Sequence, residues 1–142
     1  MKECWKYPKS WDCSQMDTLS THTDERGTLT VVESGQTLPF EVKRAYWIYD
    51  VPKGMSRGRH ANFTSFQYLV AVKGYVRICL ENKEGKKNYC LDSPSKGLLI
   101  PPYTWNELLE FSEDAVLLVL SSQHYDRKTY IDSYEEFLTL IK

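Results

Sequence analysis

The chain has 142 residues, which is enough for one domain with a continuous hydrophobic core. Its 42% hydrophobic and 26% charged residues are typical of a globular protein and exclude a disordered chain. The formal net charge of −1, from 18 basic and 19 acidic residues, argues against nucleic acid or an anionic membrane as the main partner, because both require a concentrated basic surface.

Residues 1–20 are predicted to form an N-terminal extension without the apolar stretch of a signal peptide. No later apolar run approaches the length of a membrane span. The four cysteines (Cys4, Cys13, Cys79 and Cys90) lack C-x-x-C spacing, so they indicate neither a zinc site nor a redox motif. We interpret Cys79 and Cys90 as buried thiols in a reducing cytoplasm, with a bridge between the two as the alternative.

Residues 21–131 are predicted to form an all-β barrel. Short runs of strand-forming residues recur about every ten positions and are separated by turn signals such as Pro52-Lys53-Gly54 and Lys73-Gly74. The predicted strands are 28–33, 44–49, 67–73, 75–80, 87–91, 97–100, 106–111 and 115–121. Short, evenly spaced strands of this kind indicate an antiparallel sandwich or barrel.

The end of the chain, residues 132–142, is predicted to be a short helix. Ser133 and Glu136 have the spacing of a capping box, in which a hydroxyl and a carboxylate satisfy free amides at a helix start. Apolar residues then follow at helical spacing, namely Tyr134, Phe137, Leu138 and Ile141. This helix is expected to pack against the outside of the barrel, which makes residues 1–142 a single domain.

The segment from Arg57 to Asn62 is the most informative about chemistry. Side chains alternate along a strand, so His60 and Asn62 are expected to share one face, in the position where a cupin metal site has His-x-His. Asn62, Gln67 and Asn106 stand where further metal ligands would be sought. Neutral amides are weak ligands for a transition metal, and a single histidine does not hold one. We therefore predict that no metal or other cofactor is used.

His60 is the leading candidate for proton transfer. Its imidazole titrates near neutrality, so it can act as a base and then as an acid. The adjacent Gly58 allows a ligand to approach the backbone closely. The alternative is that His60 is a hydrogen-bonded strand residue without a catalytic role. A second candidate is Tyr46, whose phenol can donate a hydrogen bond inside the barrel, although alternation places either Tyr46 or Trp47 inside and not both.

Three arginines stand at strand edges or turns: Arg26, Arg44 and Arg57. If they converge, their guanidinium groups can hold a diphosphate through paired hydrogen bonds. The alternative is that they are solvated surface residues.

Several motifs occur in an order that resembles a known family. They are Asp24-Glu-Arg-Gly27, Pro39-Phe-Glu-Val-Lys-Arg-Ala-Tyr46, Arg57-Gly-Arg-His-Ala61, Gly97-Leu-Leu-Ile-Pro101, Trp105 and Tyr125-Asp with Tyr130-Ile131 and Tyr134. Together they resemble the dTDP-4-oxo-6-deoxy-D-glucose 3,4-ketoisomerases, the WxcM-like sugar isomerases. The similarity runs from about residue 20 to the C-terminus.

This resemblance implies a cupin double-stranded β-helix, or jelly-roll barrel, that forms a homodimer and binds a dTDP-linked 4-oxo-6-deoxy sugar. The implied reaction moves the carbonyl from C4 to C3 through an enediol, without a redox cofactor. It implies His60 as the general base and Tyr46 as a catalytic partner. The implied substrate-binding residues are Arg26, Arg44, Arg57, Asn62, Gln67, Trp105 and Asn106.

The chain differs from the family pattern at two of these positions. The family typically has His-Ala-His and a further histidine after the tryptophan, whereas this chain has Asn62 and Asn106 there. An amide can orient an enediolate but cannot accept a proton near neutral pH. Two alternatives therefore stay open: a sugar-nucleotide-binding cupin without turnover, and a related isomerase or epimerase that acts on another nucleotide sugar.

Overall fold

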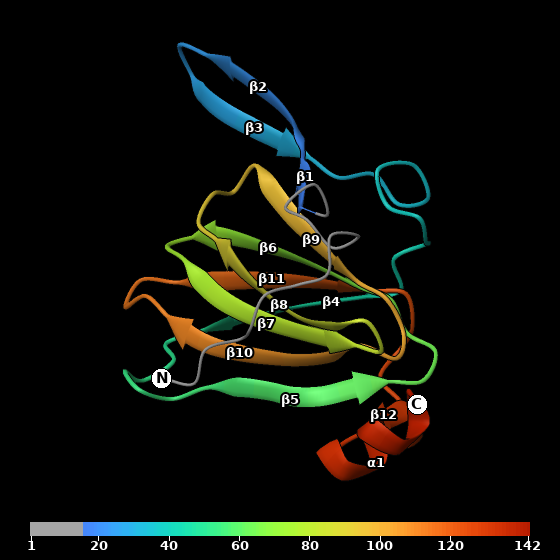
Figure 1. The fold of residues 1–142 in the computed structure, drawn as a ribbon. Coiled ribbons are helices and arrows are strands. Elements are labelled where there is room, and N and C mark those ends of the chain that lie inside the picture. Colours follow the sequence, from blue (N-terminus) through green and yellow to red (C-terminus); the bar gives the residue numbers. More distant parts are fainter. Residues whose placement is uncertain (1–15) are drawn as a thin grey trace.

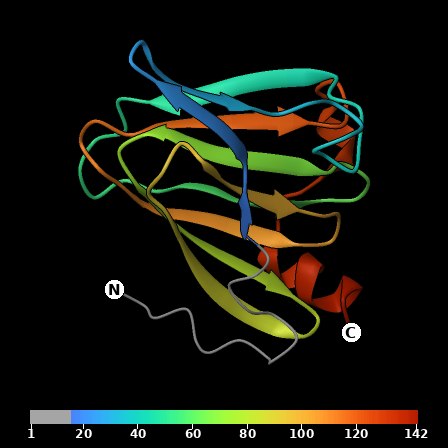
Figure 2. The ribbon, with the colours of Figure 1, turned by 90° about the horizontal axis from the view of Figure 1, so that it is seen from above.

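Two antiparallel five-stranded sheets form the barrel in the computed structural model, which describes residues 16–142 (Figure 1). The first sheet has the order β1-β9-β6-β11-β4. Its strands are β1 (Met16–Thr18), β4 (Arg44–Tyr49), β6 (Gln67–Lys73), β9 (Lys96–Ile100) and β11 (Val116–Ser121). Figure 2 shows from above that β4, β11, β6 and β9 run side by side.

The second sheet has the order β12-β5-β10-β7-β8. Its strands are β5 (Arg57–Asn62), β7 (Val76–Asn82), β8 (Gly85–Leu91), β10 (Trp105–Phe111) and β12 (Tyr130–Ile131). From β4 to β7 and again from β8 to β11, successive strands alternate between the two sheets, so hydrogen-bonded neighbours such as β4 and β11 lie far apart in the sequence. Two packed antiparallel sheets with this connectivity and a short helix at the end confirm the predicted all-β jelly-roll fold.

The hydrophobic core lies between the two sheets. Inward-facing residues of β7 (Val76, Ile78 and Leu80) pack with Leu117 and Val119 of β11 from the opposite sheet. A second cluster covers the outer face of the first sheet, where Tyr68 and Val70 contact Leu38 and Phe40 of the segment 32–43. The first sheet is therefore covered on both faces over part of its area.

The C-terminal segment packs against the edge of the second sheet. A 3-10 turn (Arg127–Thr129) leads into β12, and α1 (Tyr134–Leu140) follows. The Ser133 hydroxyl accepts a hydrogen bond from the Glu136 amide at 3.2 Å, which confirms the predicted helix start. The fully buried Ile131 and Phe137 pack with Trp105, so burial of this apolar face holds both β12 and the helix in place.

The β2–β3 hairpin stands apart from both sheets. Its strands, β2 (Ser20–Asp24) and β3 (Gly27–Val31), form their own two-stranded sheet and project from the barrel on the side away from α1 (Figure 1). Most of its residues are exposed, including Leu29 at 61%. The hairpin thus exposes apolar surface and free strand edges.

Each predicted strand overlaps a strand of the structure. The predicted ranges 44–49 and 67–73 coincide with β4 and β6. β2 was not predicted because its threonines and charges carry no apolar alternation, and β12 has only two residues. β1 lies inside the predicted N-terminal extension, yet it pairs with β9.

The cysteine interpretation needs correction. Cys90 is an exposed free thiol, because it points outward from β8, and Cys79 is disulfide-bonded. A bridge between these two residues is therefore wrong, and so is the description of both as buried thiols. Cys4 and Cys13 lie outside the described residues.

None of the helices in the part of the chain that the structure describes is long and apolar enough to cross a membrane.

Candidate active site

A cavity of about 210 Å³ lies between the two sheets. Its polar lining comes from strands of both sheets and from β12, namely Arg44, Tyr46, Arg57, His60, Gln67, Asn106 and Tyr130. Its apolar lining consists of Ile48, Leu69, Ile100, Leu108 and Val119. The cavity therefore combines a largely apolar floor with a few polar groups that converge on it, as is typical of small-molecule sites.

β4 supplies one wall through regular alternation. Arg44, Tyr46 and Ile48 face the cavity, whereas Trp47 and Tyr49 face outward and are 58% and 57% exposed. Alternation allowed only one of Tyr46 and Trp47 to lie inside, and the structure places Tyr46 there. The Arg44 guanidinium lies 4.6 Å from the centre of the Tyr46 ring, a cation–π contact that orients both side chains.

β5 supplies the opposite wall through an irregularity. Asn106 pairs with His60 and Glu107 with Gly58, so Arg59 is an extra residue that bulges out of the ladder. Gly58 and Arg59 have φ angles of 84° and 65°. In a regular strand Arg57 and His60 would face opposite sides, because they are three residues apart. The extra residue allows both to line the cavity.

Gly58 is required at this bulge by space as well as by conformation. A Cβ atom there would lie 2.5 Å from the Asn106 Oδ1 atom and 3.2 Å from the Asn106 carbonyl oxygen. The Asn106 amide also donates to the His60 carbonyl oxygen at 3.0 Å. Asn106 therefore fixes the position of the backbone that carries His60.

The His60 ring is held in the wall with one nitrogen available. Its Nε2 atom is buried and has no hydrogen-bond partner, and its ring centre lies 4.9 Å from that of Tyr130. Burial lowers the pKa of His60 below its ordinary value, and Arg127 lowers it further. A hydrogen bond with the Gly58 backbone and the charge of Asp132 oppose this shift. The imidazole is consequently neutral at neutral pH, as a general base must be.

The Tyr46 phenol faces the cavity from the other side. The Gln67 amide donates a hydrogen bond to its oxygen at 3.4 Å. Burial, together with the nearby Tyr130, raises the pKa of Tyr46 above its ordinary value, and Arg44 opposes the increase. Tyr46 is therefore a protonated phenol at neutral pH and can donate its proton.

Two of the three predicted arginines line the cavity. Arg44 and Arg57 approach it from opposite sheets, and neither has a carboxylate partner among residues 16–142. Two positive charges at a partly apolar cavity favour an anionic ligand. Arg26 does not join them, because it lies at the turn of the β2–β3 hairpin and pairs there with Asp24 at 2.6 Å.

Two other predicted site residues lie outside the cavity. The side-chain Oδ1 atom of Asn62 accepts hydrogen bonds from the backbone amides of Thr64 and Ser65, and its Nδ2 atom donates to the Thr129 hydroxyl. Asn62 therefore stabilises the turn after β5. Trp105 is buried beneath α1 against Tyr134 and Phe137. Neither residue lines the cavity, which a motif position alone does not reveal.

Tyr130 lines the cavity but was not predicted from the sequence to be a site residue. It belongs to β12, which pairs with β5 so that Tyr130 lies opposite Asn62. Its ring contacts both His60 and Tyr125. In the sequence, Tyr130 stands out only as part of the motif from Tyr125 to Tyr134 that resembles the family. That motif assigned no function to Tyr130.

Comparison with known proteins identifies the family. The family model described as "FdtA: WxcM-like, C-terminal" matches residues 12–142, nearly the whole chain. The chain belongs to the WxcM-like family.

Several relatives in this family have named activities. The chain is 39% identical over 114 residues to the TDP-4-oxo-6-deoxy-alpha-D-glucose-3,4-oxoisomerase of Aneurinibacillus thermoaerophilus, which covers 80% of this chain and 82% of the relative. It is 37% identical to a double mutant of the QdtA 3,4-ketoisomerase of Thermoanaerobacterium thermosaccharolyticum in complex with TDP, with a TM-score of 0.87 over 89% of this chain and 92% of the other. A single mutant of QdtA in complex with TDP-4-keto-6-deoxyglucose is 35% identical, with the same TM-score and coverage.

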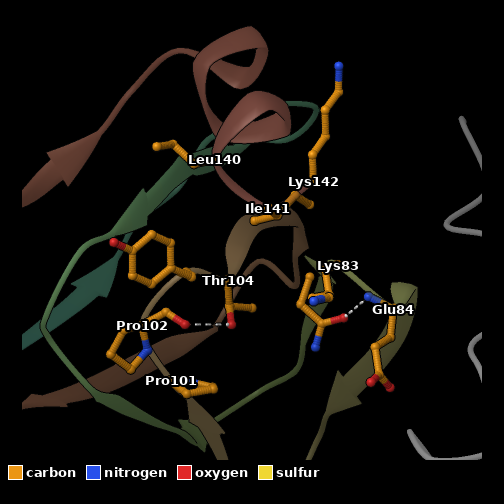
Figure 3. Close-up of a pocket in the computed structure, with 10 residues that line it drawn as sticks. Lys83, Glu84, Pro101, Pro102, Thr104, Leu140, Ile141 and Lys142 are labelled. Atoms are coloured by element: carbon orange, nitrogen blue, oxygen red, sulfur yellow. Dashed lines mark hydrogen bonds between the residues drawn. The ribbon is translucent and has the colours of Figure 1, made fainter.

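This WxcM-like chain has a second, larger hollow on its surface (Figure 3). It measures about 690 Å³ and lies between the β7–β8 turn, the segment 101–104 and the C-terminal residues 140–142. Lys83, Glu84 and Lys142 bring charges of both signs to its rim, and none of the predicted catalytic residues lies there. The smaller cavity is the candidate site, because His60, Tyr46 and Gln67 converge on it and can take part in proton transfer.

Metal-binding side chains do not gather in this WxcM-like cavity. Residues 16–142 contain no group of three or more His, Cys, Asp or Glu side chains suited to holding a metal ion. Within the cavity lining of the described chain, His60 is the only side chain of a type that transition metals prefer.

Proposed function

We propose that this protein is a dTDP-sugar 3,4-ketoisomerase, which moves the carbonyl of a dTDP-linked 4-oxo-6-deoxyhexose from C4 to C3. The observation that carries the proposal is the His60 Nε2 atom, which is buried without a partner, in a residue that lines the same cavity as the Tyr46 phenol. Relatives at 37% and 39% identity are named a 3,4-ketoisomerase and a 3,4-oxoisomerase, and another mutant of the first of these, QdtA, is in complex with TDP-4-keto-6-deoxyglucose.

The proposed reaction needs no external oxidant or reductant. The His60 Nε2 atom takes the proton from C3, and the C3–H electrons form the C3=C4 double bond of an enediol as the Tyr46 phenol gives its proton to the C4 oxygen. The C3 hydroxyl then returns a proton to the Tyr46 oxygen, and the new C3 carbonyl forms as C4 accepts the proton from His60. The net change is one hydrogen moved from C3 to C4 and one from the C3 oxygen to the C4 oxygen.

Binding of the substrate is proposed to rest on Arg44 and Arg57. These guanidinium groups flank the cavity from opposite sheets, which suits a diphosphate between them. Gln67 and Asn106 also line the cavity with neutral amides, which can orient the sugar oxygens. Asn62 and Trp105 act indirectly, by holding the turn after β5 and the base of α1 in place.

We propose that the protein acts as a homodimer, in which the β2–β3 hairpin of each chain packs against the other chain. The hairpin exposes Leu29 at 61%, and β4 is an edge strand that exposes Trp47 at 58%. Free edges and apolar patches of this kind are usually covered by a partner. In such a dimer Arg26, which lies far from the cavity of its own chain, would reach the cavity of the partner.

Turnover is tested with the purified full-length chain and dTDP-4-oxo-6-deoxyglucose. We expect proton NMR to show a 3-oxo product, with the rate unchanged by a chelator. The configuration of the product at C4 is read from the same spectra. Tight binding of dTDP in a calorimetric titration without any turnover would instead select a binding protein, and turnover of a different nucleotide sugar would select a related isomerase or epimerase.

The dimer is tested by light scattering and by complementation. We expect a mass of two chains in solution and a roughly 10- to 100-fold loss of dTDP affinity in Arg26→Ala, since charge-assisted hydrogen bonds contribute about 1.5–3 kcal/mol. Mixing Arg26→Ala with His60→Asn at low substrate should give more activity than the two variants give separately, because mixed dimers contain one intact site. A monomeric wild type, or no gain in activity after the subunits exchange, would contradict a dimer in which Arg26 reaches the cavity of the partner.

A further inference from the structure

The cavity contains two phenols, and the proposed function uses only one of them. Tyr46 projects from β4 of the first sheet, and Tyr130 projects from β12 at the edge of the second sheet. Both residues line the same cavity of about 210 Å³, so their phenols approach it from opposite sheets. His60 lies beside Tyr130, with 4.9 Å between the ring centres.

The Tyr130 hydroxyl is available to a ligand. Within the described chain it forms no hydrogen bond, although it lines the cavity. The ring itself is held firmly. Tyr130 pairs with β5, its neighbour Ile131 is fully buried, and its ring packs between His60 and Tyr125. A rigid ring with a free hydroxyl at a reactive cavity is the arrangement of a preorganised donor.

The proposed reaction requires groups that donate and accept protons at the two sugar oxygens. Moving a carbonyl between adjacent carbons takes a proton from the C3 oxygen and delivers one to the C4 oxygen. The amides Asn62 and Asn106, which stand where the family has histidines, cannot carry a proton near neutral pH. Asn62 also lies outside the cavity, and Asn106 is bound to the His60 carbonyl. Phenols, in contrast, donate and accept protons through one oxygen atom.

We propose that Tyr130 is a second catalytic tyrosine, which forms a proton-carrying pair with Tyr46 between the C3 and C4 oxygens of the sugar. One phenol donates its proton to the C4 oxygen as the enediol forms. The other phenol accepts the proton of the C3 hydroxyl as the C3 carbonyl forms, and one proton passes between the two phenols to restore both. No proton or electron is gained or lost overall. This inference rests on the proposed ketoisomerase activity.

The kinetic test compares Tyr130→Phe with Tyr46→Phe and the double variant. Removing one donor to a developing oxyanion typically costs about 10²–10³-fold in kcat, so we expect Tyr130→Phe to lower kcat by that factor with little change in KM. Because the two phenols act as one unit, the double variant should be no slower than the slower single variant. The pair would be overturned if the loss of kcat in the double variant were the product of the two single losses. It would also be overturned if Tyr130→Phe kept full activity.

Tyr125→Phe is the matched control. Tyr125 also packs against Tyr130, but its hydroxyl is outside the cavity lining and its side chain is 62% exposed. We expect its activity within about twofold of wild type. The affinity for dTDP, which lacks the hexose, should be the same in Tyr130→Phe and wild type. A parallel loss of dTDP affinity would show that Tyr130 supports the nucleotide site instead, and would overturn the proposal.

A further measurement does not depend on turnover. The ionisation of Tyr46 can be followed by NMR of tyrosine ring carbons, with circular dichroism as a check that the fold is intact. Arg44 and Tyr130 are the charged or titratable groups that act on Tyr46. Removing the Tyr130 hydroxyl should lower the pH at which Tyr46 ionises, and an unchanged titration would overturn the pair. If the wild type is inactive but this coupling is present, the ketoisomerase function fails while the phenol pair stands.

Discussion

The two walls of the cavity, β4 and β5, reach the same site by different physical means. β4 is a regular edge strand in which alternation alone points Arg44, Tyr46 and Ile48 inward. β5 contains a bulge at Arg59, with Gly58 and Arg59 both at positive φ. The bulge changes which residues face inward and brings Arg57 and His60 to the same side.

This difference shows where a sequence pattern is reliable. In β4 every inward residue follows from a period of two, so a substitution there changes one side chain and leaves the backbone as it is. In β5 the position of His60 depends on a close approach between Gly58 and Asn106 from the neighbouring strand. Substitutions in β5 should therefore lower both stability and activity. Substitutions of inward residues in β4 should lower activity and leave stability nearly unchanged.

The largest effect is expected at His60. His60→Asn keeps a polar side chain of similar size but removes the base, so kcat for the dTDP-4-oxo sugar should fall by about 10²–10⁴-fold. The NMR assay measures the loss, and calorimetry with dTDP checks that binding is kept. Full activity in this variant would remove His60 from the role of base.

The next effect is expected at Tyr46 in β4. Tyr46→Phe removes a hydroxyl that faces the cavity and should lower kcat about 10²–10³-fold, with a thermal unfolding midpoint near that of wild type. Tyr49→Phe is the control on the same strand, because Tyr49 faces outward and is 57% exposed. Its activity should stay within about twofold of wild type. Equal losses in the two variants would contradict the alternation assigned to β4.

A smaller effect on activity, coupled to a loss of stability, is expected at Gly58 in β5. In Gly58→Ala the methyl group meets Asn106, and the positive φ adds backbone strain of about 1–3 kcal/mol. Gly54→Ala is the control, since Gly54 has the same φ of 84° but no atom within 4 Å of a Cβ. Chemical denaturation should show a greater loss for Gly58→Ala, and kcat should fall only there. Equal losses of stability would mean that contact with Asn106 is unimportant.

The smallest expected effect is a shift in pH dependence. Burial lowers the pKa of His60, so the acid limb of the kcat/KM profile should lie below pH 6.5, the ordinary value for histidine. His60 also contributes stability that is present above that pH and is lost as the pH falls through the lowered pKa. Asp132→Asn removes a charge that raises this pKa and should move the limb lower still. An acid limb of the kcat/KM profile at or above pH 6.5 would contradict a lowered pKa of His60.

The amino-acid sequence by itself determined the fold class and the regular part of the site. Short runs of strand-forming residues predicted β4 and β6, and the capping residue Ser133 predicted the final helix, because these depend on local spacing and on hydrogen bonds between near neighbours. Side-chain alternation restricted the inward aromatic of β4 to Tyr46 or Trp47. His60, as the lone imidazole in a cupin-like motif, was also visible from the sequence.

The tertiary structure decided the rest, because contacts between distant segments have no local signature. The bulge that aligns Arg57 with His60 depends on β10, and Tyr130 reaches the cavity only because β12 pairs with β5. Contacts with residue 129 and with residues 134–137 place Asn62 and Trp105 outside the cavity lining. Local periodicity thus specifies which strands form, whereas the pairing of strands specifies which of their side chains meet at the site.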